Sequence, residues 1–342
     1  MDQINTESSS ILLSWQKLIA PYQHPDQARS ILQLITTLLG YAAFWGLMIF
    51  SLQISYWLTT IFVIISALFL VRVFIIFHDC GHGSFFKSKS VNRWVGFLLG
   101  VLTFTPSEDW WHEHAIHHAT AGNLDKRGTG DVTTLTLNEY RSSSKWNRLV
   151  YRVFRHPLAM FLIGPVVVFF LRQRFPSVNA GMREKFSVLY TDLALAILFI
   201  GMSFLIGWKE FLVLQLAVMW LAAAGGIWLF YVQHQFENVY WRRNSEWDYV
   251  ESAFLGASCY RLPGFLEWFS GNIGYHHIHH ISPRIPNYFL KVCYLENLPL
   301  QQATTLNLRT GLKSLSLRLW DEKAGKMVGF AEVRRNTIIP DS

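Results

Sequence analysis

The stretch Ile54–His82 reads ISYWLTTIFVIISALFLVRVFIIFHDCGH, and it sets the kind of fold that this chain adopts. Its segment Ile54–Phe77 is almost wholly apolar and exceeds the length of about 20 residues that a helix needs to cross a bilayer. Two histidines, His78 and His82, follow directly. The stretch therefore predicts a membrane-spanning helix that carries imidazoles to one surface of the membrane.

The composition of the whole chain agrees with a membrane protein. Of the 342 residues, 51% are hydrophobic and 15% are aromatic, and the mean hydropathy is +0.22. Soluble domains are rarely so apolar. We predict four spans in two hairpins with tight turns at 51–53 and 208–210; the spans are Ile31–Phe50, Ile54–Phe77, Val188–Gly207 and Phe211–Val232.

Two shorter apolar runs, Val95–Thr105 and Leu158–Leu171, lie between the hairpins. Runs of this length more often lie in the membrane interface, or enter and return, than cross. A full crossing by Val95–Thr105 would also put the histidines of 114–118 on the opposite face from His78. We therefore expect an all-α integral membrane protein with four transmembrane helices and a helical cap that holds the histidines.

Basic residues predict the orientation of these spans. Fourteen Lys and Arg lie between Phe85 and Phe186, twelve follow His234, and the two hairpin turns together hold one. By the positive-inside rule the histidine face is cytoplasmic. The expected segments are 1–30 (cytoplasmic), 31–77 (first hairpin), 78–187 (cytoplasmic, with two histidine boxes and interfacial segments), 188–233 (second hairpin) and 234–342 (cytoplasmic, with the last box and a tail).

Several other features limit the class of protein. The net charge of +7 comes without a Lys/Arg-rich patch interleaved with polar residues, so no nucleic-acid partner is expected. Three scattered cysteines without a CxxC motif do not predict a disulfide framework. Residues 1–10 lack a basic region before an apolar core, so we expect no cleaved signal peptide. Arg72, inside the second span, has two interpretations: it snorkels to the interface, or it offers a polar contact in a substrate path.

Histidines gather in four groups at or beyond the span ends. They are HDCGH (His78–His82), HAIHH (His114–His118), the single His234 after the fourth span, and HHIHH (His276–His280). Positions i, i+3 and i+4 share a helix face, so each box directs two or three imidazoles to one point. Imidazole is the usual neutral ligand of iron, copper and zinc.

Nine convergent imidazoles are too many for one ion, since one zinc takes four ligands, so two metals are predicted. The HxxHH spacing makes His114 and His276 ligands and leaves His112 and His277 as outer partners or solvated residues. Ligating imidazoles usually donate their other N–H to an acid or a carbonyl. The candidates for such outer positions are Asp79, Glu113, Glu237, Asp248, His112 and His277.

These boxes resemble those of the membrane fatty acid desaturases, and the resemblance runs from about His78 to Tyr288. It is most similar to bacterial acyl-lipid desaturases of the delta-12/omega-6-like branch, which includes the Bacillus-type delta-5 enzyme. The strings that carry it are HDCGHGSFF (His78–Phe86), EHAIHHATAGNLDKRGTGDV (Glu113–Val132), FYVQHQFE (Phe230–Glu237) and NIGYHHIHHISPRIPNY (Asn272–Tyr288).

The resemblance implies an enzyme of a bacterial inner or thylakoid membrane that introduces a cis double bond into acyl chains of membrane lipids. It implies two nonheme iron ions, O2 as co-substrate, and electrons from ferredoxin or a similar carrier. Phe230 stands where animal acyl-CoA desaturases have an Asn that holds a water ligand, and no HPGG haem signature is present, so a separate donor is expected. The implied iron ligands are His78, His82, His114, His117, His118, His234, His276, His279 and His280.

Two other functions fit the same residues less well. A di-iron hydroxylase or ketolase of the same superfamily, acting on an alkane or carotenoid, would use the same ligands and differ in its product. A metal transporter would place its ligands near mid-membrane between spans. Here the histidines lie at and beyond the span ends, which favours an enzyme.

Overall fold

The computed structural model describes residues 15–335. The N-terminal residues on which the signal-peptide expectation rests lie outside this range. Four helices are long and apolar enough to cross a membrane, and they form two hairpins, which confirms the predicted all-α membrane fold. These spans are α2 (Gln27–Ser51), α3 (Tyr56–Gly81), α8 (Met182–Ile206) and α9 (Trp208–His234).

Residues at the two turns hold each hairpin together. In the first, the hydroxyls of Ser51 and Thr59 lie 2.8 Å apart and join the end of α2 to the start of α3. In the second, Gly207 alone separates α8 from α9, and its φ of +89° lies in a region that favours glycine. Short turns of this kind keep consecutive helices side by side.

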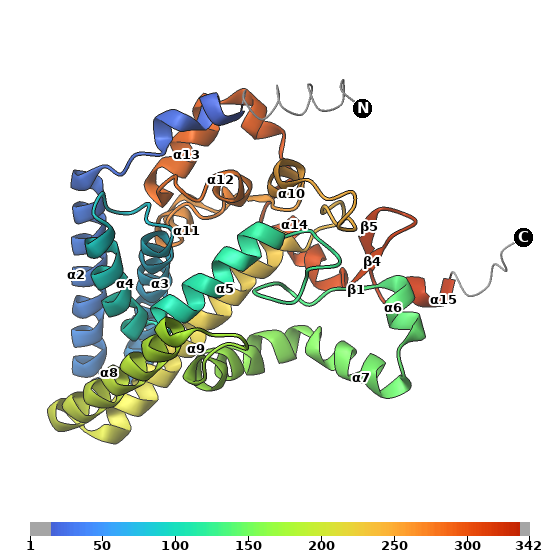
Figure 1. Cartoon of the computed structure of the whole chain (residues 1–342). Helices are drawn as coiled ribbons and strands as arrows, with labels where there is room; N and C mark the ends of the chain where they lie inside the picture. The colour runs from blue at the N-terminus through green and yellow to red at the C-terminus, as the bar shows by residue number, and fades with distance from the viewer. Residues whose placement is uncertain (1–14, 336–342) are drawn as a thin grey trace, which may run out of the picture.

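The four spans differ in how much of their surface the protein covers. In the most apolar stretch of α3, 56% of the residues are buried, against 6% for α8. Helix α3 packs against α2, α9 and the shorter helix α4 (Lys89–Leu102), and is therefore the central span (Figure 1). The outer face of α8 exposes large apolar side chains such as Phe204, at 88%, as a lipid-facing helix does.

The segment after α3 turns back without crossing. The predicted run Val95–Thr105 mostly lies in α4 (Lys89–Leu102), which is too short to span. Helix α5 (Ser107–Thr120) follows, and α8 later begins beside its first turn, where the backbone N–H of Glu108 donates to Ser187 Oγ at 3.0 Å. Both hairpins therefore present their histidine ends on the same side.

The second short run, Leu158–Leu171, follows a bend in the chain. Helix α7 (Lys145–Phe154) meets the following helical segment, Ala159–Arg174, at 62°. That segment packs on a span, because Trp220 Nε1 of α9 donates to the Leu162 carbonyl at 3.0 Å. The elements of this region are α6 (Leu137–Ser142), α7, and the single-turn helices η2 (Ala159–Ile163), η3 (Val166–Leu171) and η4 (Arg172–Arg174).

A helical cap covers the histidine ends of α3 and α9 (Figure 1). It is built mainly from the C-terminal third of the chain, with η1 (Ala20–Tyr22) packed against α13. Its other helical elements are α10 (Tyr249–Leu255), α11 (Gly264–Phe269), α12 (His276–Ile281), α13 (Asn287–Glu296), η5 (Leu298–Gln302), α14 (Leu308–Lys313), η6 (Ser314–Ser316) and α15 (Glu332–Arg335).

Five very short strands, which the sequence did not predict, fasten the cap. Strand β1 (Leu135–Thr136) pairs in parallel with β4 (Leu319–Asp321), with Leu135 opposite Leu319. Strand β4 pairs antiparallel with β5 (Lys326–Val328). Strands β2 (Cys259–Tyr260) and β3 (Thr305–Leu306) form a separate parallel pair. Both parallel pairs join segments far apart in sequence.

The side chain of Arg72 makes its polar contacts inside the protein and does not reach solvent. Its side chain is buried, its Nε donates to Thr37 Oγ1 at 3.1 Å, and its guanidinium donates to the Trp268 carbonyl and stacks 4.0 Å from the Trp268 ring. Snorkelling is therefore wrong for this residue. Arg72 fastens α11 of the cap to α2 and α3.

Candidate metal centre

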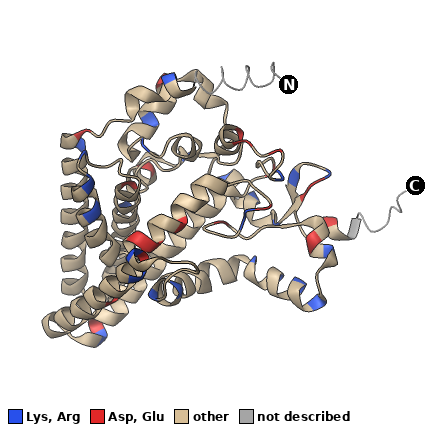
Figure 2. Cartoon of the chain, in the orientation of Figure 1, with Lys and Arg blue, Asp and Glu red and all other residues tan. Residues whose placement is uncertain are grey.

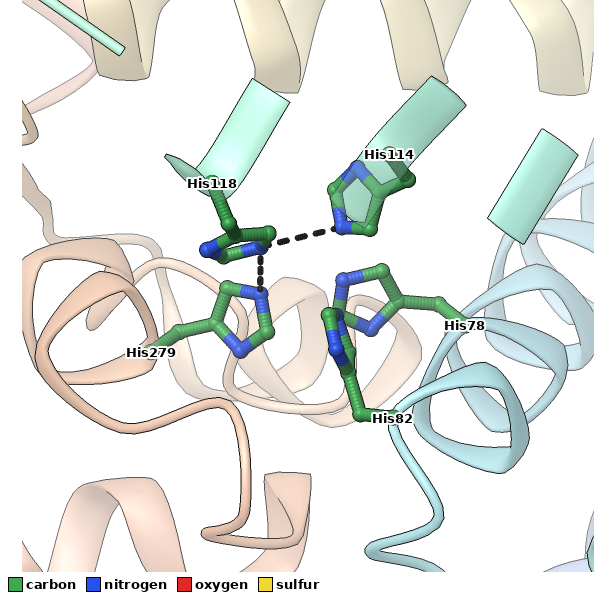
Figure 3. Close-up of side chains that lie close together, drawn as sticks. All are labelled: His78, His82, His114, His118 and His279. Carbon is green, nitrogen blue, oxygen red and sulfur yellow. Dashed lines mark hydrogen bonds between the residues drawn. The ribbon is translucent and has the colours of Figure 1, made fainter. Parts of the chain in front are cut away.

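Nine histidines meet beneath the cap in two adjoining groups. In the first, the five-histidine group, each residue offers one ring nitrogen, and these five nitrogens lie within 4.8 Å of one another; Figure 3 shows the rings pointing toward a common space. The second holds three histidines within the same limit. The five-histidine group is His78, His82, His114, His118 and His279; the second group is His117, His234 and His280.

A ninth histidine joins the second group. His276 Nε2 lies 2.9 Å from His234 Nε2, and its ring centre lies 4.7 Å from that of His280. We therefore call His117, His234, His276 and His280 the four-histidine group. The two groups are in contact, since the ring centres of His118 and His280 are 4.3 Å apart.

The spacing of the nitrogens suits metal ligands. His118 Nε2 lies 3.1 Å from His114 Nε2 and 3.0 Å from His279 Nε2. Two imidazoles bound to one ion at about 2.1 Å, in tetrahedral or octahedral geometry, have nitrogens roughly 3.0–3.4 Å apart. The two pairs of nitrogens joined by dashed lines in Figure 3 therefore have the separation of neighbouring ligands.

Each HxxHH box divides between the two groups, which differs from the expectation that a box serves one point. On α5, His114 and His118 enter the five-histidine group and His117 enters the other. Helix geometry explains the division, because positions i+3 and i+4 lie about 100° apart around the axis. On α12, His279 is the one that turns to the five-histidine group.

Outer partners orient three of the imidazoles. His78 Nδ1 bonds Asp79 Oδ1 at 3.0 Å, and His117 Nδ1 bonds Asp131 Oδ1 at 2.6 Å. His234 Nδ1 bonds the Gly256 carbonyl at 3.1 Å. Each contact occupies Nδ1 and leaves Nε2 directed to the shared space. Outer hydrogen-bond partners orient metal-ligating histidines in this way.

The electrostatics of the site fit a metal ion. Burial lowers the pKa of the imidazoles outside the spans, which keeps them neutral and their lone pairs free; these are His82, His114, His118, His276, His279 and His280. Buried polar atoms normally have a partner, yet Nε2 of His82, His117 and His280 has none among the described protein atoms. A donor set of neutral imidazoles suits iron, copper or zinc, so the residues fit such a group.

Comparison with known proteins identifies the family. The family described as fatty acid desaturase matches residues 54–304, well over half of the chain. The chain belongs to the fatty acid desaturase family. It is 44% identical over 328 residues to a fatty acid desaturase of Bacillus subtilis (strain 168), covering 95% of this chain and 93% of that one.

More distant relatives carry more specific names. An "sn-1 acyl-lipid omega-3 desaturase (ferredoxin)" of Synechocystis is 29% identical over 252 residues, which covers 69% of this chain and 66% of that protein. An "omega-3 fatty acid desaturase, endoplasmic reticulum" of Vigna radiata is 27% identical over 239 residues, covering 64% and 59%. With four apolar spans, this desaturase is an integral membrane oxidoreductase.

The structure sorts the six outer candidates of the desaturase. Asp79 Oδ1 contacts His78 Nδ1, and its Oδ2 accepts hydrogen bonds from Asn287 N at 2.7 Å and Asn287 Nδ2 at 2.8 Å, tying α3 to α13. His277 is buried beside the centre, but its Nε2 bonds the Leu300 carbonyl at 2.9 Å. It therefore points away from the shared space.

The other four candidates have other surroundings. Glu113 pairs with Arg172 at 2.8 Å, and Glu237 is exposed and lies 3.8 Å from Lys326. Asp248 accepts the Glu251 N–H at 2.9 Å and caps α10. His112 is exposed to solvent. Helix rotation explains His112 and Glu113, since it turns the neighbours of a buried residue on α5 toward the surface, whereas Glu237 and Asp248 lie beyond the end of α9.

Two outer partners were missed. Asp131 lies 14 positions after His117, and the Gly256 carbonyl lies 22 positions after His234. Every residue has a backbone carbonyl, so the residue type at position 256 could not indicate this partner. The one available signal was the quoted GTGDV string, in which Gly130 adopts a φ of +68° and packs so closely that a Cβ there would lie 3.0 Å from His117 Cβ.

Phe230 provides no polar atom to the centre. Its ring centre lies 5.2 Å from that of His117 and 5.0 Å from that of His234. It therefore lines the four-histidine group with apolar surface, at the position where the family resemblance raised the question of a water ligand.

Proposed function

We propose that this desaturase introduces a cis double bond into acyl chains of membrane lipids, using O2 and two electrons delivered by ferredoxin. The observation that carries the proposal is the pair of adjoining histidine groups at the ends of two spans. The printed names of the acyl-lipid, ferredoxin-linked relatives support the substrate and the donor.

In this proposal the nine histidines hold two nonheme iron ions. The five-histidine group would hold one ion and the four-histidine group the other. When bound, the two irons would supply, with O2 and two electrons, the oxidising power that removal of hydrogen from an unactivated CH2 requires. Asp79, Asp131 and the Gly256 carbonyl fix the orientation of their imidazoles.

The proposed reaction needs a centre that admits an apolar chain and limits bulk water. Two hydrogens leave adjacent carbons, and with O2, two electrons and two protons the products are an alkene and two waters. Aromatic rings line the centre: Trp110 stacks on His114 with ring centres 4.5 Å apart, and Phe74 packs on Trp110 at 5.2 Å. Such a wall limits bulk water and favours an apolar chain.

We further propose that the centre faces the cytoplasm of a bacterial inner membrane, or the equivalent side of a thylakoid. The support is the distribution of basic residues, which are abundant in the segments on the histidine side and nearly absent from the hairpin turns. That side would meet the electron donor.

The test is a lipid profile. The full chain would be expressed in a bacterium that lacks such desaturases, beside His279→Ala and the exposed control His112→Ala. Membrane fatty acids would be analysed by gas chromatography and mass spectrometry after the double bonds are derivatised. We expect new unsaturated chains with the wild type and His112→Ala and none with His279→Ala.

Two results would overturn the proposal. If folded, iron-loaded protein supplied with ferredoxin gave hydroxylated or keto products, a hydroxylase or ketolase function would replace the proposed desaturase function. If His279→Ala retained the wild-type profile, the five-histidine group would not be the reactive centre.

A further inference from the structure

Helix α7 carries an apolar face that no other part of the described chain covers. Its members recur at i, i+3, i+4, i+7 and i+8, the spacing of one helix face, and are between 49% and 69% exposed. We call this face the α7 stripe: Trp146, Leu149, Val150, Val153 and Phe154. Exposed singly such residues mean little, but a contiguous patch marks an interaction surface.

The opposite face of α7 packs on the cap. Tyr151 is buried, and its hydroxyl accepts the Leu135 N–H at 3.1 Å and donates to the Arg318 carbonyl at 2.6 Å. Arg152 Nε donates to Tyr140 Oη at 2.5 Å. The rotation of α7 about its axis is therefore fixed, and the α7 stripe must face outward.

Cations follow one edge of the stripe. Lys145, Arg148 and Arg152 lie at i, i+3 and i+7, between the stripe and the packed face. From Tyr140 to Arg183 the chain has eight Lys and Arg and no Asp or Glu, and in Figure 2 α7 carries blue and no red. No ion pair joins these three cations to an acid in the described residues 15–335.

The stripe continues into the membrane-facing part of the protein. The segment after α7 exposes more apolar side chains, including Leu158, Ile163 and Leu171, and packs on the spanning helix α9 through the Trp220–Leu162 contact. At 10 residues α7 is too short to cross. The 62° bend instead lets α7 lie across the direction of the segment that follows it.

We propose that α7 lies in the membrane interface on the histidine side, with the α7 stripe in the acyl–headgroup boundary and the edge cations Lys145 and Arg148 on anionic lipid headgroups. A short helix with an apolar stripe bordered by Lys and Arg is the form that binds in the plane of an anionic leaflet. The anchor is independent of any metal or acyl substrate, because none of its residues belongs to the histidine groups.

Spin labels at single cysteines test the proposal in the full-length protein. Leu149→Cys and Val153→Cys would be labelled in nanodiscs of phosphatidylcholine and phosphatidylglycerol. Collision rates with O2 and with a water-soluble nickel chelate report immersion. Ile197→Cys on α8, 71% exposed, is the lipid reference, and the exposed Ala324→Cys in the β4–β5 turn is the water reference. The native cysteines are buried, and unsubstituted protein gives the labelling background.

We expect both stripe labels to collide with O2 and avoid nickel, as the Ile197 label does. Nickel accessibility equal to that at Ala324 would overturn the proposal. Protection from both reagents, with dipolar broadening between labels, would instead mean that a second copy covers the stripe, and would also overturn it.

The cations are tested separately with Lys145→Gln/Arg148→Gln. In the anionic nanodiscs the ratio of immersed to water-exposed Val153 label should fall by up to about thirtyfold, since two cations each contribute about fivefold near such a surface. In phosphatidylcholine alone the double variant should match its parent. An unaltered signal from the Ile197 label would show that the double variant is folded. An unchanged ratio in the anionic nanodiscs would then contradict the headgroup contact.

Discussion

At the scale of single residues, the centre depends on which nitrogen each histidine presents. The sequence indicated the nine imidazoles that the structure brings together, although not how each HxxHH box divides between the two groups, and it made Asp79 a candidate partner because that residue is adjacent to His78. It could not predict Asp131, which reaches His117 through a loop. Long-range contacts of this kind follow from tertiary structure and leave no periodic signal.

Asp131→Asn should weaken metal binding at the four-histidine group without unfolding the protein. An amide is a weaker acceptor than a carboxylate for the His117 N–H, and loss of such a partner typically costs 10–100-fold in metal affinity. We expect iron per chain to fall toward half under limiting iron. Asp125→Asn, an exposed carboxylate paired with Arg243, is the matched control. Equal iron in the two purified variants would refute the role of Asp131.

At the scale of elements, one side chain sets the packing of α3, α4 and α5. The Trp111 indole of α5 packs directly on two glycines, Gly81 and Gly96. A Cβ added at Gly81 would lie 2.2 Å from the indole, and one added at Gly96 would lie 2.4 Å from it. Its Nε1 donates to the Phe77 carbonyl at 3.3 Å. Two glycines thus let α5 approach α3 closely enough for the first two histidine boxes to meet. Their 15-residue separation gave no sequence signal.

Gly96→Ala should therefore lower the melting temperature of the purified protein by several degrees. Overpacking a close contact costs about 1–3 kcal/mol. The control is Gly46→Ala in α2, where a Cβ meets nothing within 4 Å. There the gain in helix propensity, about 0.5–1 kcal/mol, should leave the melting temperature unchanged or higher. Equal shifts in both variants would show that the Trp111 contact does not matter.

Arg72→Met should also destabilise the protein, although Arg72 touches no histidine. The substitution removes the hydrogen bonds of Arg72 to Thr37 Oγ1 and to the Trp268 carbonyl, and hydrogen bonds made by a charged group contribute about 1.5–3 kcal/mol each. The exposed Lys87→Met provides the comparison. Thermal unfolding in detergent should separate the two variants. If Arg72→Met instead melted with the wild type while altering products, the substrate-path interpretation of Arg72 would be supported.

At the scale of the whole molecule, the sequence predicted the four spans and their pairing because apolar length is a local property. It missed the α7 stripe, which lies in a 10-residue helix before the run Leu158–Leu171 that was expected to be interfacial. It also missed all five strands, since strands of two or three residues are defined by their partners. The cap was expected to be helical, and these strands are the exception.

The net charge of +7 predicts how an electron donor approaches. An acidic ferredoxin should be steered toward the basic face, and salt should screen that attraction beyond a Debye length of about 10 Å at 0.1 M. Reduction of the enzyme by ferredoxin, followed by stopped flow, should slow as ionic strength rises. A rate independent of salt would exclude electrostatic steering.

The most direct test of the account is the metal content of the full chain and of two variants that each remove a ligand from one group. Wild type purified from iron-replete cells should hold two irons per chain. His82→Ala, in the five-histidine group, and His234→Ala, in the four-histidine group, should each hold no more than one. A single metal in the wild type, or two irons retained in either folded variant, would contradict a two-iron centre built from these nine histidines.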